Sequence, residues 1–263
     1  MSQASANVNV MIKAARKAAR SLLRDFGEVE NLQVSSKGPG DFVSRADTKA
    51  EALIREELTE ARPNYGWLGE ESVEVKGADP TRRWIVDPLD GTTNFLHGLP
   101  HWSISIGLEH KGEVVAGVIY DPARDEMFVA EKGAGAYLND RRLRVSGRKD
   151  TLEMIFATGI PFAAGGDLPV SLREIATIAV LSAGIRRLGS TALDLAYVAA
   201  GRVDGFWDRG LKPWDVAAGI LIVREAGGLA GPMTADGDML AGGGLIAANA
   251  HAFDPLTRLL RAA

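Results

Sequence analysis

The chain has 263 residues, of which 46% are hydrophobic and 24% charged, as expected of one large globular domain or two smaller ones that share an interface. The formal net charge of -4 argues against a nucleic-acid-binding surface, which usually needs a basic surplus. The absence of cysteine excludes disulfides, thiolate nucleophiles, zinc–thiolate sites and iron–sulfur clusters. No stretch approaches the roughly 20 apolar residues that span a bilayer. Residues 1–10 do not resemble a secretory signal, so we expect a cytoplasmic protein without membrane contact.

The N-terminal half predicts two helices followed by a series of strands. Apolar residues recur at helical spacing over residues 11–26, before Gly27, and over residues 50–61, before Pro63. Short apolar or alternating segments predict strands over residues 84–87, 103–108, 114–120 and 127–129, and a hairpin over 135–143. Because no helix separates these strands, they predict a largely antiparallel sheet flanked by the two helices.

The C-terminal half mixes helices with short strands. Ser190 is a candidate N-cap and Gly201 a stop for one of the helices. The expected helices cover residues 172–181, 191–200, 215–226 and a final segment from Asp254, and the expected strands cover 205–208 and 245–248. A change of character near residues 146–151 predicts an N-terminal part, 1–148, and a C-terminal part, 149–263.

The segment from Trp84 to Asn94 carries the clearest chemical pattern. An apolar strand ends on Asp87, a proline turns the chain, and Asp90 follows before Gly91. Two carboxylates at a strand end suit Mg²⁺, which prefers oxygen ligands, and amides near Gly91 and Thr92 could face an anion. Asp-Pro and Asp-Gly pairs are also common turn formers, so spacing alone supports a surface turn about equally well.

Three motifs in order remove this ambiguity. They are Gly69-Glu70-Glu71-Ser72, the octapeptide from Asp87 to Asn94 (DPLDGTTN), and the octapeptide from Lys212 to Gly219 (KPWDVAAG). Together they resemble the inositol monophosphatase family, within the lithium-sensitive, metal-dependent sugar-phosphate phosphatases. The resemblance runs from the first helix to the last. It implies an α+β fold, a layered αβαβα sandwich of the sugar-phosphatase type. It also implies that the protein is a phosphoric monoester hydrolase and forms a homodimer.

The same resemblance implies a set of magnesium ligands. Glu70, Asp87 and the carbonyl of Leu89 would hold one ion, and Asp87, Asp90 and Asp215 a second, with Asp87 bridging. A third, weaker ion would bind near the first through Glu70, giving two or three Mg²⁺ ions per site. Taken singly, Asp215 is a favourable helix-start carboxylate and Glu70 an ordinary surface acid.

The resemblance also implies that the nucleophile is a metal-activated water, oriented and deprotonated by Glu70 and Thr92. The sequence is consistent with a water nucleophile, because it has no cysteine, no Gly-x-Ser-x-Gly elbow for a serine nucleophile and no Walker-type loop. Asp47 would assist by hydrogen-bonding to Thr92 or to metal-bound waters. Its alternative interpretation is an N-terminal helix carboxylate.

Substrate contacts are expected from two regions. Asp90, Gly91 and Thr92 would lie at the phosphate, and Gly189, Thr191 and Asp208 at the alcohol, where an acidic acceptor suits the hydroxyl groups of a polyol. Asp208 stands where better-known animal members carry Glu, and Thr191 stands where they carry Ala. These differences leave the identity of the alcohol part of the substrate undetermined. Asp208 could equally be a structural acid at a strand end.

The expected reaction is hydrolysis of myo-inositol monophosphate, or a related polyol or sugar phosphate, to the alcohol and inorganic phosphate. Histidinol phosphate, or another sugar or nucleotide phosphate, is the alternative within the same superfamily. A hypothesis of another class is a regulatory protein that binds RNA polymerase or acts in ribosome assembly. Its contacts would come from exposed arginines that otherwise are ordinary surface charge: Arg141, Arg142, Arg144, Arg173, Arg186 and Arg187.

Overall fold

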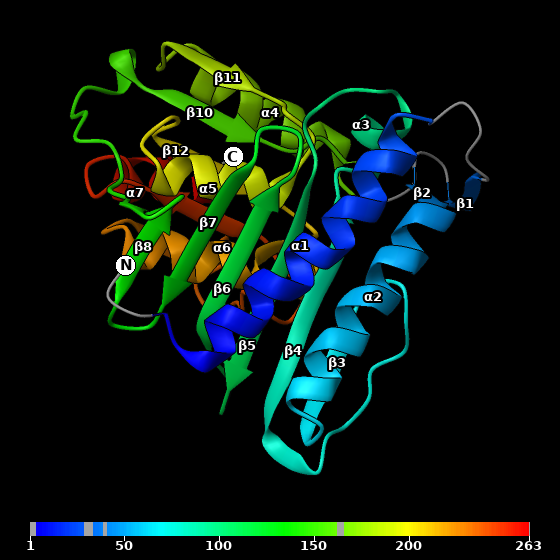
Figure 1. Ribbon diagram of the computed structural model, residues 1–263. Helices are drawn as coiled ribbons and strands as arrows, with labels where there is room; N and C mark the ends of the chain where they lie inside the picture. Colours follow the sequence, from blue (N-terminus) through cyan, green and yellow to red (C-terminus); the bar gives the residue numbers. More distant parts are fainter. Residues whose placement is uncertain (1–3, 29–33, 39–40, 162–165, 263) are drawn as a thin grey trace.

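The protein forms five stacked layers in the computed structural model, which describes residues 4–28, 34–38, 41–161 and 166–262 (Figure 1). Helices α1 (Ala6–Phe26) and α2 (Arg45–Ala61) cover one face of a seven-stranded sheet. Helices α5 (Thr191–Ala199) and α6 (Pro213–Glu225) lie between this sheet and a five-stranded one, whose other face is covered by α4 (Leu168–Ala179) and α7 (Phe253–Ala262). The expected αβαβα sandwich is therefore confirmed.

The larger sheet is antiparallel except at one edge. Its strands follow the chain in order: β3 (Tyr65–Gly69), β4 (Asp79–Asp90), β5 (Ser103–His110), β6 (Glu113–Asp121), β7 (Glu126–Glu131), β8 (Gly135–Leu138) and β9 (Arg141–Arg142). The sequence did not predict β3, which pairs parallel to β4, and it placed the start of β4 at residue 84 instead of 79. Residues 79–83 at the start of β4 are mostly polar, whereas β3 is a five-residue segment with glycine at two positions, which lowers its strand propensity.

The smaller sheet has the order β11-β10-β12-β14-β13 and mixes parallel with antiparallel pairs. Its strands are β10 (Ile155–Thr158), β11 (Gly184–Arg186), β12 (Gly205–Asp208), β13 (Leu229–Pro232) and β14 (Leu245–Ala248). Helix α4 begins four residues earlier than predicted, because Asp167 caps it by accepting a hydrogen bond from the Val170 amide at 3.0 Å. Short elements complete the fold: β1 (Val34–Gly38), β2 (Asp41–Ser44), α3 (Thr92–Leu96) and a 3-10 turn (Thr151–Glu153).

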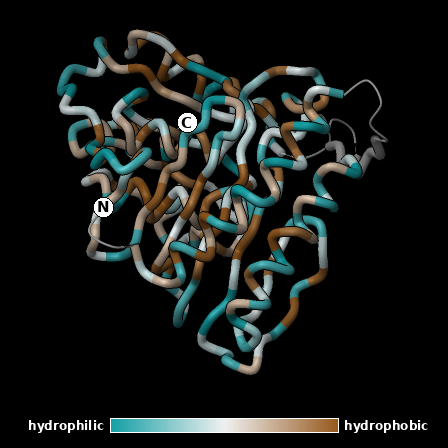
Figure 2. The backbone as a smooth tube through the Cα atoms, viewed as in Figure 1, coloured by the Kyte–Doolittle hydropathy of each residue, from teal (hydrophilic) through white to brown (hydrophobic). Residues whose placement is uncertain are grey.

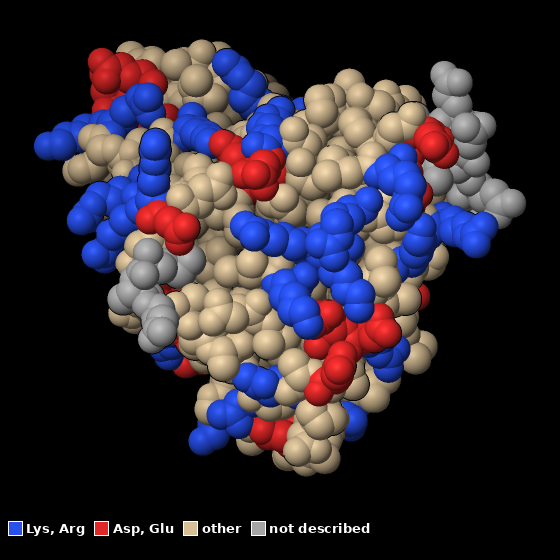
Figure 3. All heavy atoms as spheres, in the orientation of Figure 1, with Lys and Arg blue, Asp and Glu red and all other residues tan. Residues whose placement is uncertain are grey.

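The buried apolar side chains form clusters between the layers. Figure 2 shows how the hydrophobic residues are distributed along the backbone. The predicted apolar face of α1, with Met11, Ala18 and Leu22, is buried against the larger sheet. Its opposite face is basic, and lysine and arginine side chains gather there with acidic residues of α2 among them (Figure 3). Among the residues that the structure describes, no helix combines the length and apolarity needed to cross a membrane.

Helix α6 approaches the larger sheet unusually closely. Gly107 of β5 and Gly117 of β6 are direct cross-strand partners, and both face the backbone of α6 at residues 217–218. A Cβ atom on Gly117 would lie 2.9 Å from the Ala218 carbonyl oxygen and 3.0 Å from its Cα. These two missing side chains let α6 lie against the sheet. The buried cluster around α6 contains residues from both halves of the chain, and the division at residues 148/149 stays a prediction.

We predict that Gly117→Ala lowers the free energy of unfolding by about 1–3 kcal/mol, because the added methyl group must displace the α6 backbone. Urea unfolding measures this. Gly147→Ala is the matched control, since no atom lies within 4 Å of its added Cβ, and it should leave the stability within about 0.5 kcal/mol. Equal effects of the two substitutions would contradict the tight contact.

Candidate active site

The end of β4 forms one wall of a cavity of about 250 Å³. Pairing with β5 is interrupted between Asp87 and Asp90, which accommodates Pro88, a residue without an amide hydrogen for the ladder. Within this irregularity the Leu89 amide donates to Asp87 Oδ1 at 3.0 Å. Gly91 then takes a left-handed conformation with φ of 95°, so that the chain turns directly into α3. A side chain there would be strained and would press on the His101 and Gly189 carbonyl oxygens.

Segments distant in sequence complete the cavity. Glu70 follows β3, and its amide donates to the Val86 carbonyl at 3.2 Å, which places it beside β4. All but one of the predicted site residues line the cavity: Glu70, Asp87, Leu89, Asp90, Gly91, Thr92, Gly189, Thr191, Asp208 and Asp215. The exception, Asp47, touches the site through Thr92. Tertiary structure thus brings the predicted residues together, while their individual roles stay predictions.

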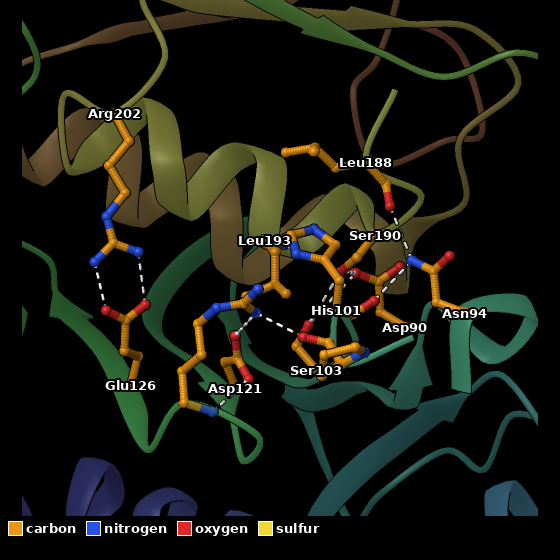
Figure 4. A network of polar contacts seen from close by, with 12 residues as sticks. Asp90, Asn94, His101, Ser103, Asp121, Glu126, Leu188, Ser190, Leu193 and Arg202 are labelled. Carbon is orange, nitrogen blue, oxygen red and sulfur yellow. Dashed lines mark hydrogen bonds and ion pairs between the residues drawn. The ribbon is translucent and has the colours of Figure 1, made fainter. Parts of the chain in front are cut away.

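Asp90 is held by the first turn of α5. It accepts hydrogen bonds from the Ala192 amide at 2.8 Å and from the Thr191 amide at 3.2 Å. It also accepts one from the Ser190 hydroxyl (Figure 4). Burial raises the pKa of Asp90, and these donors act in the opposite direction because they favour the charged form. The amides of a helix N-terminus therefore offset part of the cost of placing this charge inside the protein.

Two more carboxylates occupy helix starts. Asp47 is the third residue of α2 and accepts from both the amide and the hydroxyl of Ser44, at 2.8 and 2.6 Å, in a capping box. Its other oxygen lies 2.9 Å from the Thr92 hydroxyl, so the helix-start interpretation and the contact with Thr92 both hold. Asp215 is the third residue of α6, which begins two residues earlier than predicted, and it accepts from the Lys212 amide at 2.7 Å.

Several carboxyl groups gather at the β4 end of this cavity. Burial raises the pKa of Asp87 well above its ordinary value, and the neighbouring charges of Glu70, Asp90 and Asp215 raise it further. Burial likewise raises the pKa of Asp215 to about 8. Such a group of oxygen donors suits a hard divalent cation such as Mg²⁺, which would relieve the repulsion.

The carboxylates do not form a ready-made metal shell. Among the described residues, no three aspartate, glutamate or histidine side chains are grouped closely enough to hold one ion as they stand. Asp90 and Asp215 each direct an oxygen toward helix amides. The donor set thus fits Mg²⁺ in its chemistry, and filling an octahedral shell would require these side chains to turn.

Asn94 has a role that the sequence did not reveal. Its side-chain amide donates to the His101 carbonyl and to the Leu188 carbonyl, both at 2.8 Å (Figure 4). The side chain is 7% exposed and packs against Gly189. It thereby links the loop after β4 to the segment that leads into α5. The contact joins residues 94 positions apart, so no local pattern could have predicted it.

The other end of the cavity is formed by the C-terminal half. Asp208 ends β12, accepts a hydrogen bond from the Arg209 amide at 2.7 Å and packs directly against Gly159. Burial raises its pKa to about 6. Further residues here were missed from the sequence because they had no recognisable motif: Thr158, Gly159, Ile160, Pro161, Asp194 and Leu211. Arg187, predicted as a surface residue, also lines this end.

Comparison with known proteins places this arrangement in a family. The model of the inositol monophosphatase family matches residues 4–262. A Rhizobium meliloti protein named inositol-1-monophosphatase is 55% identical over 257 residues, covering 98% of this chain and 97% of its own. The Escherichia coli Nus factor SuhB is 43% identical over 242 residues, covering 92% and 91%. The crystal structure of the extragenic suppressor protein suhB from Bartonella henselae superposes with a TM-score of 0.94 at 54% identity, covering 98% and 99%.

We predict that Asp215→Asn stabilises the metal-free protein increasingly as the pH rises from about 4 to 8. The Asp215 carboxyl has a pKa of about 8 when folded and 3.8 ordinarily, so within this window the unfolded chain gives up a proton that the folded chain retains. The free energy of unfolding of the parent therefore decreases as the pH rises through this window. The variant lacks the contribution of Asp215 to this decrease, because its amide side chain does not titrate. Urea unfolding with a chelator measures the difference.

Adding Mg²⁺ provides the control, since a cation favours the charged carboxylate and should stabilise the parent more than the variant. A stability difference that is constant from low to high pH would contradict the repulsive environment of Asp215.

Proposed function

Because the chain belongs to the inositol monophosphatase family of phosphoric monoester hydrolases, we propose that it is a Mg²⁺-dependent phosphatase of myo-inositol monophosphate or a related small polyol or sugar phosphate. The products would be the free alcohol and inorganic phosphate. The observation that carries the proposal is the meeting, at one cavity, of carboxylates from β4, from the end of β3 and from the start of α6. The Thr92–Asp47 contact borders the same cavity.

The proposed magnesium ligands are Glu70, Asp87, Asp90, Asp215 and the carbonyl oxygen of Leu89. Bound Mg²⁺ supplies positive charge that polarises the phosphoryl group and lowers the pKa of a water, which provides a nucleophile near neutral pH. The number of ions, two or three, belongs to this proposal. The raised pKa of Asp87 supports this proposal, because a cation bound among these carboxyl groups would relieve the repulsion between their charged forms.

Thr92 and Asp47 are proposed to handle the proton of the attacking water. The Thr92 hydroxyl has its hydrogen directed to Asp47 Oδ1 at 2.9 Å or to the Leu89 carbonyl at 3.0 Å, so its oxygen keeps acceptor capacity for a water. Asp47 in turn is fixed by the Ser44 cap of α2, which orients the pair. Glu70, on the opposite wall, is proposed as the second group that orients and deprotonates this water.

Substrate contacts follow the two ends of the cavity. Gly91 and Thr92 are proposed to bind the phosphate, together with Asp90. Gly189, Thr191 and Asp208 are proposed to bind the alcohol, with Asp208 accepting hydrogen bonds from its hydroxyl groups. The two groups of residues line one continuous cavity, which supports a substrate with a phosphate at one end and hydroxyls at the other.

A second candidate function is binding within a regulatory complex, which the similarity to proteins named Nus factor SuhB favours. The exposed Arg186 beside the cavity mouth and the basic face of α1 offer surfaces for such contacts. Pull-down with a catalytically inactive variant would separate the two roles. Partners retained by an inactive protein indicate a second function that does not depend on hydrolysis.

The decisive experiment for the enzyme is phosphate release from myo-inositol 1-phosphate, histidinol phosphate, fructose 1,6-bisphosphate, 3′-phosphoadenosine 5′-phosphate and NADP, each with and without Mg²⁺. We expect Mg²⁺-dependent release with inositol phosphate preferred. Preference for another substrate would overturn the alcohol assignment alone. Absence of release from every substrate would overturn the phosphatase proposal.

We predict that Asp87→Asn abolishes Mg²⁺-dependent turnover while the fold is retained, because this carboxylate would bridge the metal ions. The metal-free variant should also unfold at a higher temperature than the metal-free parent, since a buried charge among like charges is removed. Steady-state assays and thermal unfolding monitored by circular dichroism measure both effects. Near-normal Mg²⁺-dependent activity in this variant would contradict the ligand assignment.

We predict that Thr92→Ala lowers kcat by about 10²–10⁴-fold while the Mg²⁺ concentration needed for half-maximal activity changes little, because only the proton-handling hydroxyl is lost. Thr92→Ser is the matched control and should retain most of the activity, since it keeps the hydroxyl. If the serine and alanine variants were equally impaired, the hydroxyl would have no role in proton transfer.

A further inference from the structure

Asp194 is a buried acidic residue that lines the cavity, and none of the proposed catalytic or binding roles involves it. It is the fourth residue of α5, its side chain lines the cavity, and the residue is 2% exposed. Its Oδ1 atom is buried and has no hydrogen-bond partner within the described part of the chain. Leaving a buried polar atom unpaired costs about 1–3 kcal/mol, so such an atom calls for an explanation.

Local structure does not supply that explanation. The N-cap of α5 is already Ser190, whose hydroxyl accepts from the Leu193 amide. The neighbours Leu193 and Leu195 are fully buried apolar residues, and an apolar side chain at 194 would extend the same core at lower cost. Asp194 lies in the first turn of α5, where the helix dipole favours a carboxylate by about 0.3–1 kcal/mol, which is less than the cost of a buried oxygen without a partner. Neither capping nor packing therefore accounts for a carboxyl group at this position.

The position of Asp194 relates it to the alcohol end of the cavity. Side chains on a helix lean toward its N-terminus, so that of Asp194 leans toward the Gly189–Thr191 segment. Burial raises the pKa of Asp194, the charges of Asp90 and Asp208 raise it further, and that of Arg187 acts in the opposite direction. Asp194 lines the same cavity as the proposed phosphate ligand Asp90 and the proposed alcohol ligand Asp208.

We propose that Asp194 is a second acidic acceptor for the hydroxyl groups of the leaving alcohol, beside Asp208. Two carboxyl groups at one end of a cavity can accept from neighbouring hydroxyls of one ring, and rotation about the last bond of Asp194 presents either oxygen. The substrate class is then the phosphate of a polyol with adjacent hydroxyls. This inference rests on the proposed phosphatase function.

The test compares Asp194→Ala and Asp194→Asn with the parent on myo-inositol 1-phosphate and on p-nitrophenyl phosphate, whose leaving group has no further hydroxyl, at saturating Mg²⁺. For Asp194→Ala we expect the KM for inositol phosphate to rise about tenfold, with kcat/KM for p-nitrophenyl phosphate within about twofold of the parent. Asp194→Asn, which keeps an acceptor oxygen and the side-chain volume, should show a smaller rise in the same substrate-selective sense.

Asp204→Asn is the matched control for altering a buried aspartate of the C-terminal half. Asp204 is 1% exposed, accepts from the Ile155 amide at 2.8 Å and does not line the cavity, so its variant should leave the ratio of kcat/KM for the two substrates unchanged. If Asp194→Ala does not fold, as judged by circular dichroism, the ratio measured for Asp194→Asn decides.

Equal losses of kcat/KM on both substrates would indicate that Asp194 acts at the phosphate or at the metal ions. Unchanged kcat/KM values for both substrates in every folded Asp194 variant would mean that Asp194 does not contact the alcohol. Either result overturns the inference while leaving the phosphatase intact. A parent that cleaves p-nitrophenyl phosphate but not inositol phosphate removes the polyol substrate class and this inference with it. A parent that hydrolyses neither overturns the proposed function itself.

Discussion

Repulsion among the carboxylates at the end of β4 is the constraint to which the surrounding structure responds. Asp87, Asp90 and Asp215 are held in one cavity with Glu70, and burial together with like charge raises the pKa of Asp87. Folding must overcome this repulsion before any ligand is bound. Hydrogen-bond donors fixed by secondary structure offset part of this cost.

Helix starts supply most of these donors. Asp90 accepts from the first turn of α5, Asp215 from the residue that precedes α6, and Asp47 from the cap of α2. Each contact favours the charged form of its carboxylate, which offsets part of the effect of burial and of the neighbouring charges. The closeness of α6 to the sheet depends in turn on Gly107 and Gly117, which connects the packing of the core to the position of Asp215.

The two ends of the cavity have different structural origins, so the proposed phosphoryl chemistry and the proposed alcohol recognition would rest mainly on different parts of the chain. The end of β4, together with Asp47 and Thr92, belongs to the N-terminal half, whereas Asp194 and Asp208 come from α5 and β12. Asn94 joins the two by bonding to the Leu188 carbonyl just before α5. A change at the alcohol end can therefore alter the preferred substrate while the metal end keeps its geometry.

The sequence by itself determined the helices and strands with strong periodicity and the residues of the three motifs, because periodicity and motif spacing are local properties. The motifs implied that Asp47, Glu70 and Asp215 lie near the end of β4, but only tertiary structure decided how they are held there, that β3 pairs with β4, that Asp194 lines the cavity and that Asn94 bonds to the Leu188 carbonyl. These contacts join residues far apart in the chain, and each residue taken alone is equally compatible with a helix cap, a surface acid or a turn. Only packing of the layers brings their side chains to one cavity, where burial and mutual repulsion give them chemical properties that a short segment cannot have.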